Sequence, residues 1–200
     1  GHRSPREHRQ MNINNIDGAI FIGSISDNPR AYGGKKHVHY SHGLKVNYNK
    51  DLPANLINTA LSIVYFICVN DIVYKIGQTS GKKGIKGCMG FYCVAGLDDS
   101  GHNRFTINAL IREEMSKGNK VDVYMKYIEP IKVSVSGIGR LHDLSARISA
   151  KVLEEAHLSD YKRLVNKFPS WNFQESAAKV PAHINEQFAS YRQMRAKGRK

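Results

Sequence analysis

Two short apolar segments joined by a tight turn constrain the fold of this 200-residue chain more than any other feature. Residues 63–67 and 72–77 are rich in Ile, Val and Tyr, and Asn70-Asp71 between them is typical of a hairpin turn. The hairpin carries Tyr65 on one strand and Lys75 on the other. Neither a phenol nor an ammonium enters an apolar core without cost, so a chemical role is expected for both. Simple packing of Tyr65, with Lys75 extended to solvent, is the alternative.

The charge balance indicates an anionic partner. The chain has 30 Lys and Arg against 17 Asp and Glu, a formal net charge of +13. Such an excess is typical of proteins that neutralise phosphate groups, although a solvated basic surface or an anionic membrane remain alternatives. No apolar run reaches the roughly 20 residues of a membrane span, and no lipidation signal is present. We therefore expect no membrane partner.

The cysteines and the first residues bear on location and on the start of the fold. Cys68, Cys88 and Cys93 contain no C-x-x-C pair, which argues against a disulfide framework and a structural zinc site. This pattern fits a reducing, cytoplasmic setting. Residues 1–10 resemble a leader added during cloning, so the native start is expected at Met11.

Residues 11–60 are predicted to form a polar, β-rich extension. Short strands are expected at residues 19–22 and 37–40, and a short helix from Asp51 to Ala60. Three histidines lie near the second of these strands: His37, His39 and His42. They lack a nearby carboxylate, so a surface or DNA-facing position is favoured over a metal site.

The elements after the hairpin are predicted from periodicity. A glycine-rich basic loop is expected at residues 79–90 and an amphipathic helix at residues 103–117. Residues 121–128 alternate in polarity and predict a third strand. A long helix is expected at residues 141–167, followed by a basic tail that is either disordered or bound along a phosphate backbone.

One carboxylate interrupts the apolar stripe predicted for the long helix. The stripe consists of Leu144, Ile148, Val152, Glu155 and Leu158. Glu154 would then point about 100° away. A carboxylate in an apolar row requires a partner, either a divalent metal ion or a salt bridge with Lys75 or Arg147.

Three motifs together resemble the GIY-YIG nuclease superfamily. They are Ile63-Val64-Tyr65, then Lys75-Ile76-Gly77-Gln78-Thr79, then Leu153-Glu154-Glu155-Ala156-His157-Leu158. The chain is most similar to the branch of restriction endonucleases in which lysine replaces the second motif tyrosine, as Lys75 does here. The resemblance covers about residues 62–172. It implies an α+β fold with a small three-stranded antiparallel sheet flanked by helices, and metal-dependent cleavage of DNA.

The resemblance also implies roles for individual residues. Tyr65 would be the base that activates water, and Lys75 would lower the pKa of Tyr65. Glu155 would be the protein ligand of one Mg²⁺ or Mn²⁺ ion per active site, because Leu158 follows it at the family spacing. The family places an arginine on the next helix, but Lys86 stands near that position. Arg104 is the nearest arginine, so both remain candidates for gripping the scissile phosphate.

Residues outside the catalytic motifs would bind the DNA. Basic and polar candidates are Lys82, Lys83, Lys35, Lys36 and His39. The predicted organisation is an extension (11–60), a nuclease core (61–172) and a basic tail (173–200). We expect a type II restriction enzyme that acts on double-stranded DNA as a homodimer. The alternatives are a phage or homing endonuclease of the same superfamily and a DNA-binding protein whose site has decayed.

Overall fold

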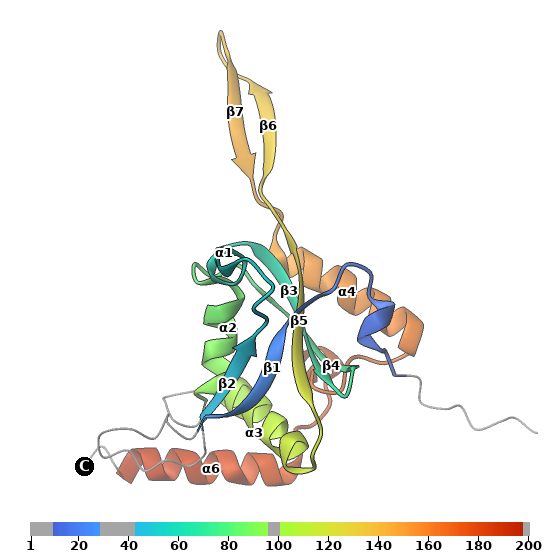
Figure 1. Cartoon of the computed structure of the whole chain (residues 1–200), viewed down its shortest axis with the longest axis vertical. Helices are drawn as coiled ribbons and strands as arrows, with labels where there is room; N and C mark the ends of the chain where they lie inside the picture. The colour runs from blue at the N-terminus through green and yellow to red at the C-terminus, as the bar shows by residue number, and fades with distance from the viewer. Residues whose placement is uncertain (1–9, 29–42, 96–100, 198–200) are drawn as a thin grey trace, which may run out of the picture.

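A five-stranded antiparallel sheet forms the centre of the protein (Figure 1). The computed structural model describes residues 10–28, 43–95 and 101–197. The strand order is β2-β1-β5-β3-β4. The strands are β1 (Ile20–Asn28), β2 (Gly43–Tyr48), β3 (Ser62–Val69), β4 (Ile72–Thr79) and β5 (Val121–Ile128). The α+β class is therefore confirmed, but the sheet is larger than the predicted three strands.

The hairpin predicted from the sequence is present as β3 and β4. Asn70 and Asp71 have φ values of 47° and 67°, the left-handed conformation that a two-residue hairpin turn requires. Every residue of β3 is buried, because β3 lies between β4 and β5 and is covered on both faces. This strand is therefore the most enclosed place in the sheet for a polar side chain.

The segment predicted as a separate extension contributes two strands to this same sheet. β1 pairs with β5, and β2 pairs with β1. A buried acid near the start of β5 accounts for part of this arrangement. The Asp122 carboxylate accepts a hydrogen bond of 2.5 Å from the Ser24 hydroxyl on β1. It also forms an ion pair of 2.8 Å with Lys120. The prediction missed β1 beyond its first residues because Gly23 and Ser24 interrupt its apolar run.

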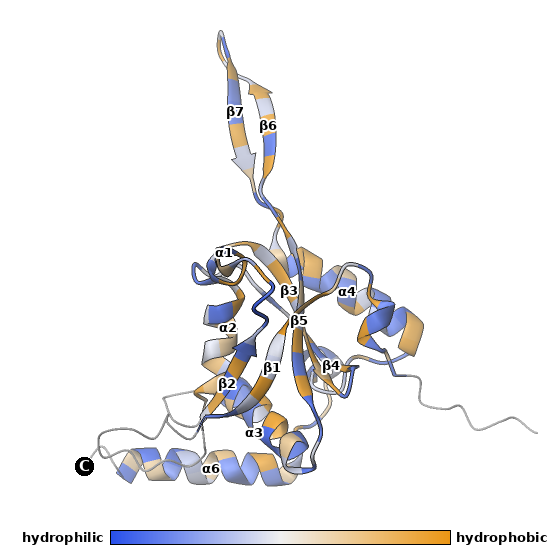
Figure 2. Cartoon of the chain, viewed as in Figure 1, coloured by the Kyte–Doolittle hydropathy of each residue, from blue (hydrophilic) through white to orange (hydrophobic). Residues whose placement is uncertain are grey.

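Helices cover both faces of the sheet. One face packs against α2 (Gly84–Cys93) and α3 (His102–Ser116), and α6 (Ala182–Lys197) packs outside α3. The other face packs against α4 (Ala150–Val165), mainly through Leu158 and Tyr161. The hydropathy colouring shows the apolar strands between these helices (Figure 2). Three short pieces complete the described fold: α1 (Ala54–Asn58), α5 (Phe173–Ser176) and the 3-10 turn η1 (Ile13–Asn15).

Two predicted elements are wrong in type. Most of the expected loop at residues 79–90 is helical, because α2 begins at Gly84 and buries Ile85 and Met89. Gly84 has a φ of +59°, so the glycines that indicated a loop serve the entry into the helix. The first part of the expected helix at residues 141–167 is instead a β-strand.

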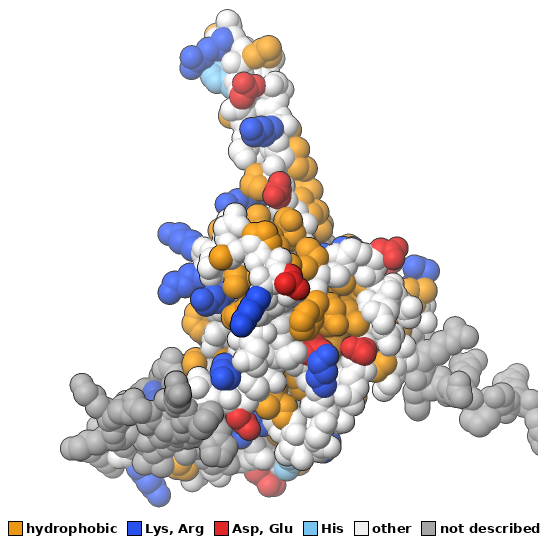
Figure 3. Space-filling model, viewed as in Figure 1, with side chains coloured by type: hydrophobic (Ala, Val, Ile, Leu, Met, Phe, Trp, Pro, Cys, Tyr) orange, Lys and Arg blue, Asp and Glu red, His pale blue; other side chains and the backbone are white. Residues whose placement is uncertain are grey.

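That strand belongs to a two-stranded arm that projects from the core (Figure 1). The arm consists of β6 (Ile131–Ser136) and β7 (Leu141–Ala146), which pair with one another only, in the part of the chain that the structure describes. Val133 opposes Leu144, and Ile131 opposes Ala146, so one face of the arm is an apolar stripe. These side chains remain largely exposed, and the stripe is visible along one edge of the arm (Figure 3). The arm therefore contributes nothing to the core.

The basic tail is helical over most of its length. In α6, Ile184 and Tyr191 are buried, and the Tyr191 ring stacks on Phe105 of α3 at 5.1 Å between centroids. His183 and Glu113 form an ion pair of 2.5 Å between the same two helices. Residues 182–197 thus form a packed helix and not a disordered tail. Among the described residues, no helix combines the length and the apolar character that crossing a bilayer requires.

Candidate active site

Tyr65 lies in the middle of β3 with its ring over Gly77 of β4. The two residues are paired in the antiparallel register, and a Cβ atom at Gly77 would collide with the Tyr65 ring and hydroxyl. Glycine is therefore required at position 77 for the phenol to lie where it does. Tyr65 is only 3% exposed, and burial raises its pKa well above the ordinary value of 10.0.

Lys75 lies on the same face of the hairpin as Tyr65. It opposes Ile67, two residues along β3 from Tyr65, and alternate residues of a strand share a face. The ammonium is buried at 6% exposure, and this burial lowers its pKa. Two carboxylates, Glu175 and Glu154, oppose the lowering. The alternative in which Lys75 extends to solvent is therefore wrong.

The buried carboxylate of α4 is Glu154, and the expectation for Glu155 is wrong. Glu154 is 6% exposed, whereas Glu155 faces solvent. The buried residues of α4 are Ala150, Glu154, Leu158 and Tyr161. The predicted stripe shared Leu158 with this face but was aligned on Leu144, which belongs to β7 and not to the helix. This error moved the acid by one position.

Glu154 is held by one basic partner near the hairpin. Its Oε1 atom lies 2.6 Å from Nζ of Lys151, one helical turn earlier, and the lysine itself is largely exposed. The Glu154 charge acts on Lys75, Tyr65 and Tyr92. The acid whose charge acts on both the phenol and the ammonium is therefore Glu154.

Two further side chains of the site, Tyr92 and Cys88, come from α2 and were not anticipated. The hydroxyls of Tyr65 and Tyr92 are hydrogen-bonded at 2.8 Å. Burial raises the pKa of the Cys88 thiol to about 11, and hydrogen bonding with Tyr65 acts against that rise. Cys88 and Tyr92 are four residues apart and share one face of the helix. Recognising residues 84–93 as a helix would have placed both of them opposite Tyr65.

A cavity of about 780 Å³ opens beside the two phenols. Its lining includes Tyr65, Tyr92, Cys88, Lys82, Lys83 and Arg104. The Arg104 guanidinium lies 4.1 Å from the centroid of the Phe91 ring, and its charge acts against the burial that raises the pKa values of Tyr92 and Cys88. Lys86 is exposed and does not line the cavity. Of the two candidates for the phosphate-gripping role, the structure brings only Arg104 to the phenols.

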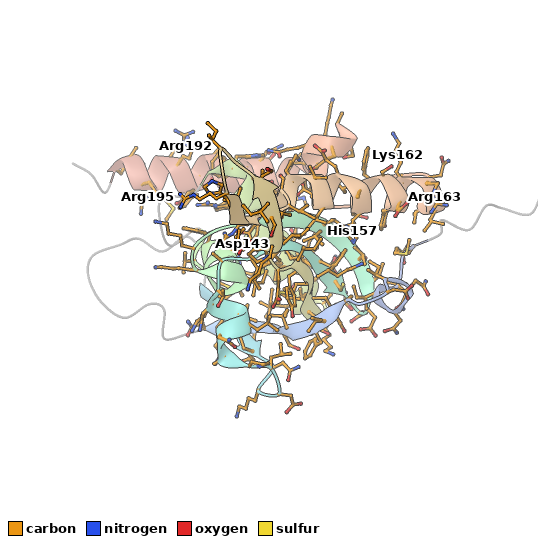
Figure 4. All side chains as sticks on the ribbon, turned by 90° about the horizontal axis from the view of Figure 1, so that it is seen from above. Asp143, His157, Lys162, Arg163, Arg192 and Arg195 are labelled. Atoms are coloured by element: carbon orange, nitrogen blue, oxygen red, sulfur yellow. The ribbon has the colours of Figure 1, made fainter. Side chains whose placement is uncertain are left out.

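Basic side chains occur on more than one surface of the protein. Lys and Arg residues gather on the flank of the core beside the base of the arm (Figure 3). Seen from above, Lys162 and Arg163 of α4 and Arg192 and Arg195 of α6 lie along one side of the molecule (Figure 4). The predicted DNA-binding residues Lys35, Lys36 and His39 lie outside the described residues, as do His37 and His42.

The donor set determines which metal ion the site could hold. Within the ranges that the structure describes, no three His, Cys, Asp or Glu side chains are close enough to form a metal cluster. A closed zinc site therefore does not fit those residues. Magnesium fits better, because one or two carboxylates with water and phosphate oxygens satisfy it. Glu154 supplies one such carboxylate next to the cavity residues.

Comparisons with known proteins give structural neighbours only. No family model matches the sequence, and no curated protein matches it significantly. Bacteriophage T4 EndoII, solved as a mutant, matches with a TM-score of 0.48 and 19% identity, over 81% of this chain and 99% of that chain. The restriction endonuclease HPY188I in complex with product DNA matches with a TM-score of 0.40 and 16% identity, over 80% of this chain and 84% of that chain. At these TM-scores and identities the likenesses assign no function, which depends instead on the residues of the site.

Proposed function

We propose that the protein is a metal-dependent DNA endonuclease. The observation that supports this proposal is the convergence of Tyr65, Lys75 and Glu154 next to a basic cavity. Burial of all three polar groups costs folding free energy, which a purely structural site would avoid by using apolar residues. The resemblance of the three motifs to the GIY-YIG nucleases fits the same residues once Glu154 replaces Glu155.

The proposed reaction is attack of water on a phosphodiester phosphorus. The ionised Tyr65 hydroxyl accepts a proton from the water as the new oxygen–phosphorus bond forms. The bond from phosphorus to the 3′ oxygen breaks, and that oxygen takes a proton from solvent. Lys75 and Arg104 stabilise the negative charge that develops on the phosphate oxygens. The charge of the buried Lys75 ammonium acts strongly on the phosphate, because little water screens it.

Glu154 would hold a Mg²⁺ ion in this scheme. The bound ion would polarise the phosphate and stabilise the leaving oxygen. The Lys151 ammonium holds the Glu154 carboxylate through an ion pair of 2.6 Å. Because Lys151 is largely exposed, it can move into solvent when the carboxylate takes another cation.

The cavity would receive the DNA backbone. Lys82 and Lys83 at its rim carry the charge that draws a phosphate in, and nearby glycines allow close approach of the main chain. Within this proposal, the enzyme is a type II restriction enzyme that acts as a homodimer on a palindromic double-stranded site. A two-fold symmetric protein matches such a site.

A second candidate function is DNA binding without cleavage. The observation that favours it is the state of Tyr65, which is 3% exposed and has a raised pKa. A phenol that stays protonated cannot accept a proton from water. The basic surfaces would then bind DNA, and the buried polar groups would be remnants of an ancestral site.

A plasmid digest with MgCl₂ separates the two functions. The nuclease proposal predicts discrete fragments for the wild type and loss of cutting in Tyr65→Phe, with retention of gel-shift binding. Retardation of DNA without any cutting by the wild type would support the second function. Smeared products would support a nuclease but would contradict sequence specificity. Tyr124→Phe is the matched control, because Tyr124 lies on β5 and packs against Phe21.

A further inference from the structure

The hydroxyl groups of Tyr65 and Tyr92 form a close pair inside the candidate site. The two oxygens are 2.8 Å apart, and the rings meet edge to face with centroids 6.2 Å apart. Tyr65 is 3% exposed and Tyr92 is 8% exposed, yet both border the cavity. A buried hydroxyl pair of this kind shares one hydrogen bond and can pass a proton along it.

The position of Tyr92 is fixed by its own set of hydrogen bonds. The Asn108 side-chain amide, 1% exposed, donates to the Tyr92 carbonyl at 2.7 Å. The Asn108 oxygen in turn accepts a hydrogen bond of 2.9 Å from Nε of Arg112. These contacts tie the last turn of α2 to α3. The backbone of Tyr92 is thereby fixed through its carbonyl group, which places the Tyr92 phenol against Tyr65.

The two phenols have different electrostatic surroundings. The groups that face the pair are Cys88 from α2, Arg104 from α3 and Glu154 from α4. Burial raises the pKa of Tyr92 to about 12, and both the hydrogen bond with Tyr65 and the Arg104 charge act against that rise. The Tyr65 pKa is raised well above 10.0, and Tyr92 itself contributes to that rise. The Arg104 charge and the hydrogen bond with Tyr65 favour negative charge on Tyr92.

We propose that Tyr65 and Tyr92 form a two-phenol proton relay, in which Tyr65 takes the proton of the attacking water and passes its own proton to ionised Tyr92. In this step the Tyr65 oxygen gains one proton and loses another, and Tyr92 becomes neutral. The new bond forms between the water oxygen and phosphorus as in the reaction above, but the phenol that is ionised at the start is Tyr92 in place of Tyr65. Tyr92 acts through Tyr65 and does not touch the substrate. This inference rests on the proposed nuclease function and makes the base a pair of residues.

The pH dependence of Tyr92→Phe tests the relay. We expect kcat at pH 8 to fall roughly 10- to 100-fold, part of the usual contribution of a general base, with KM within about twofold. We also expect the alkaline rise of kcat to move to higher pH, because Tyr65 alone must then ionise. A purely structural role for Tyr92 would lower activity equally at every pH, and an unchanged profile would likewise overturn the relay. Tyr124→Phe again serves as the control.

A second measurement keeps the test independent of nuclease activity. The full chain labelled with ¹³C at tyrosine Cζ can be titrated by NMR without DNA or metal. We expect the Tyr92 resonance to titrate at higher pH in Tyr65→Phe than in the wild type, because the hydrogen bond with Tyr65 acts against the rise of the Tyr92 pKa. An identical Tyr92 titration in the two proteins would refute the relay even if the wild type cleaves DNA. Failure of the wild type to cleave, with the shift present, would instead refute the nuclease function alone.

Discussion

The side-chain amide of Asn172 completes the open edge of β4 by bonding both backbone groups of Ile76. It accepts from the Ile76 N–H at 2.9 Å and donates to the Ile76 carbonyl at 2.8 Å. Next to it, the Trp171 N–H donates to the Tyr74 carbonyl at 2.8 Å. Residues 171–172 therefore take the place of a sixth strand beside the part of β4 that carries Lys75 and Gly77.

Replacing Asn172 should destabilise the fold. Asn172 is fully buried, so Asn172→Ala leaves a backbone donor and an acceptor of Ile76 without their partner in a dry site. We expect a loss of about 2–4 kcal/mol in the free energy of unfolding, measured by urea denaturation. Asn58→Ala is the control, because the Asn58 side chain is exposed and bonds only the Ala54 carbonyl. Similar losses in the two variants would contradict the edge-completing role.

The two neighbouring glutamates of α4 provide a matched pair for the metal role. We expect Glu154→Gln to lower the rate of plasmid cleavage by at least about 100-fold. Even residues that only orient a metal ligand change metal affinity or activity by about 10- to 100-fold. Glu155→Gln should cleave like the wild type, because Glu155 faces solvent. The comparison is made in MgCl₂ and in EDTA. Loss of cleavage in Glu155→Gln alone would restore the original assignment from the sequence.

Lys75→Met should stabilise the protein near neutral pH and abolish cleavage. Burial lowers the Lys75 pKa below its usual value of 10.5. Keeping the buried ammonium charged at pH 7 therefore reduces the free energy of unfolding. As pH rises from the folded pKa to 10.5, the unfolded chain retains the proton that the folded chain has released, and wild-type stability increases. The advantage of Lys75→Met should therefore be largest at pH 7 and shrink toward pH 10.

Urea denaturation at both pH values checks this prediction. Lys86→Met is the control, because Lys86 is exposed on α2. A wild type more stable than Lys75→Met at pH 7 would mean that the attraction of Glu154 and Glu175 outweighs desolvation.

Arg104 and Lys86 should differ in their contribution to cleavage. Arg104 lines the cavity beside the phenols, whereas Lys86 does not. We expect Arg104→Ala to lower kcat by roughly 100-fold, the usual loss when one electrostatic stabiliser of a transition state is removed. Lys86→Ala should stay within about twofold. If the order were reversed, the family position at Lys86 would hold the phosphate despite its exposure.

Removal of the arm should leave the stability of the core unchanged. Replacing residues 131–146 with a short Gly-Ser turn removes β6 and β7, whose side chains are almost all exposed. We expect the midpoint of urea denaturation to stay within the range of ordinary surface substitutions, about 0.5 kcal/mol. A larger loss would show that the arm stabilises the ends of β5 and α4.

The elements that the sequence predicts well are those whose apolar residues follow one clear helical or strand periodicity. The hairpin of β3 and β4, the helix α3 and the strand β5 lie within a few residues of their predicted bounds. Each has one clear periodicity and a turn or cap residue at its ends. The strand β1 was underestimated and β2 was missed, because β1 pairs with β5 through contacts far apart in sequence, such as Ser24 with Asp122, and β2 pairs with β1.

The sequence indicated the types of side chain in the candidate site but did not identify all of the residues. Tyr65 and Lys75 stand out because a polar group in an apolar hairpin is visible in sequence. Glu154 was missed by one position because the stripe was extended from β7 into α4, across a boundary that hydrophobicity alone does not mark. Tyr92 was hidden because glycines in α2 suggested a loop and gave no helical face to examine.

Gly77 has a consequence for how this protein can change. The Tyr65 ring occupies the volume that any other side chain at position 77 would fill. Lengthening that residue by even one methyl group would push the phenol away from β4 and from its partner on α2. A chain could therefore keep the sheet and still lose its chemistry through a substitution at a residue that has no side chain of its own.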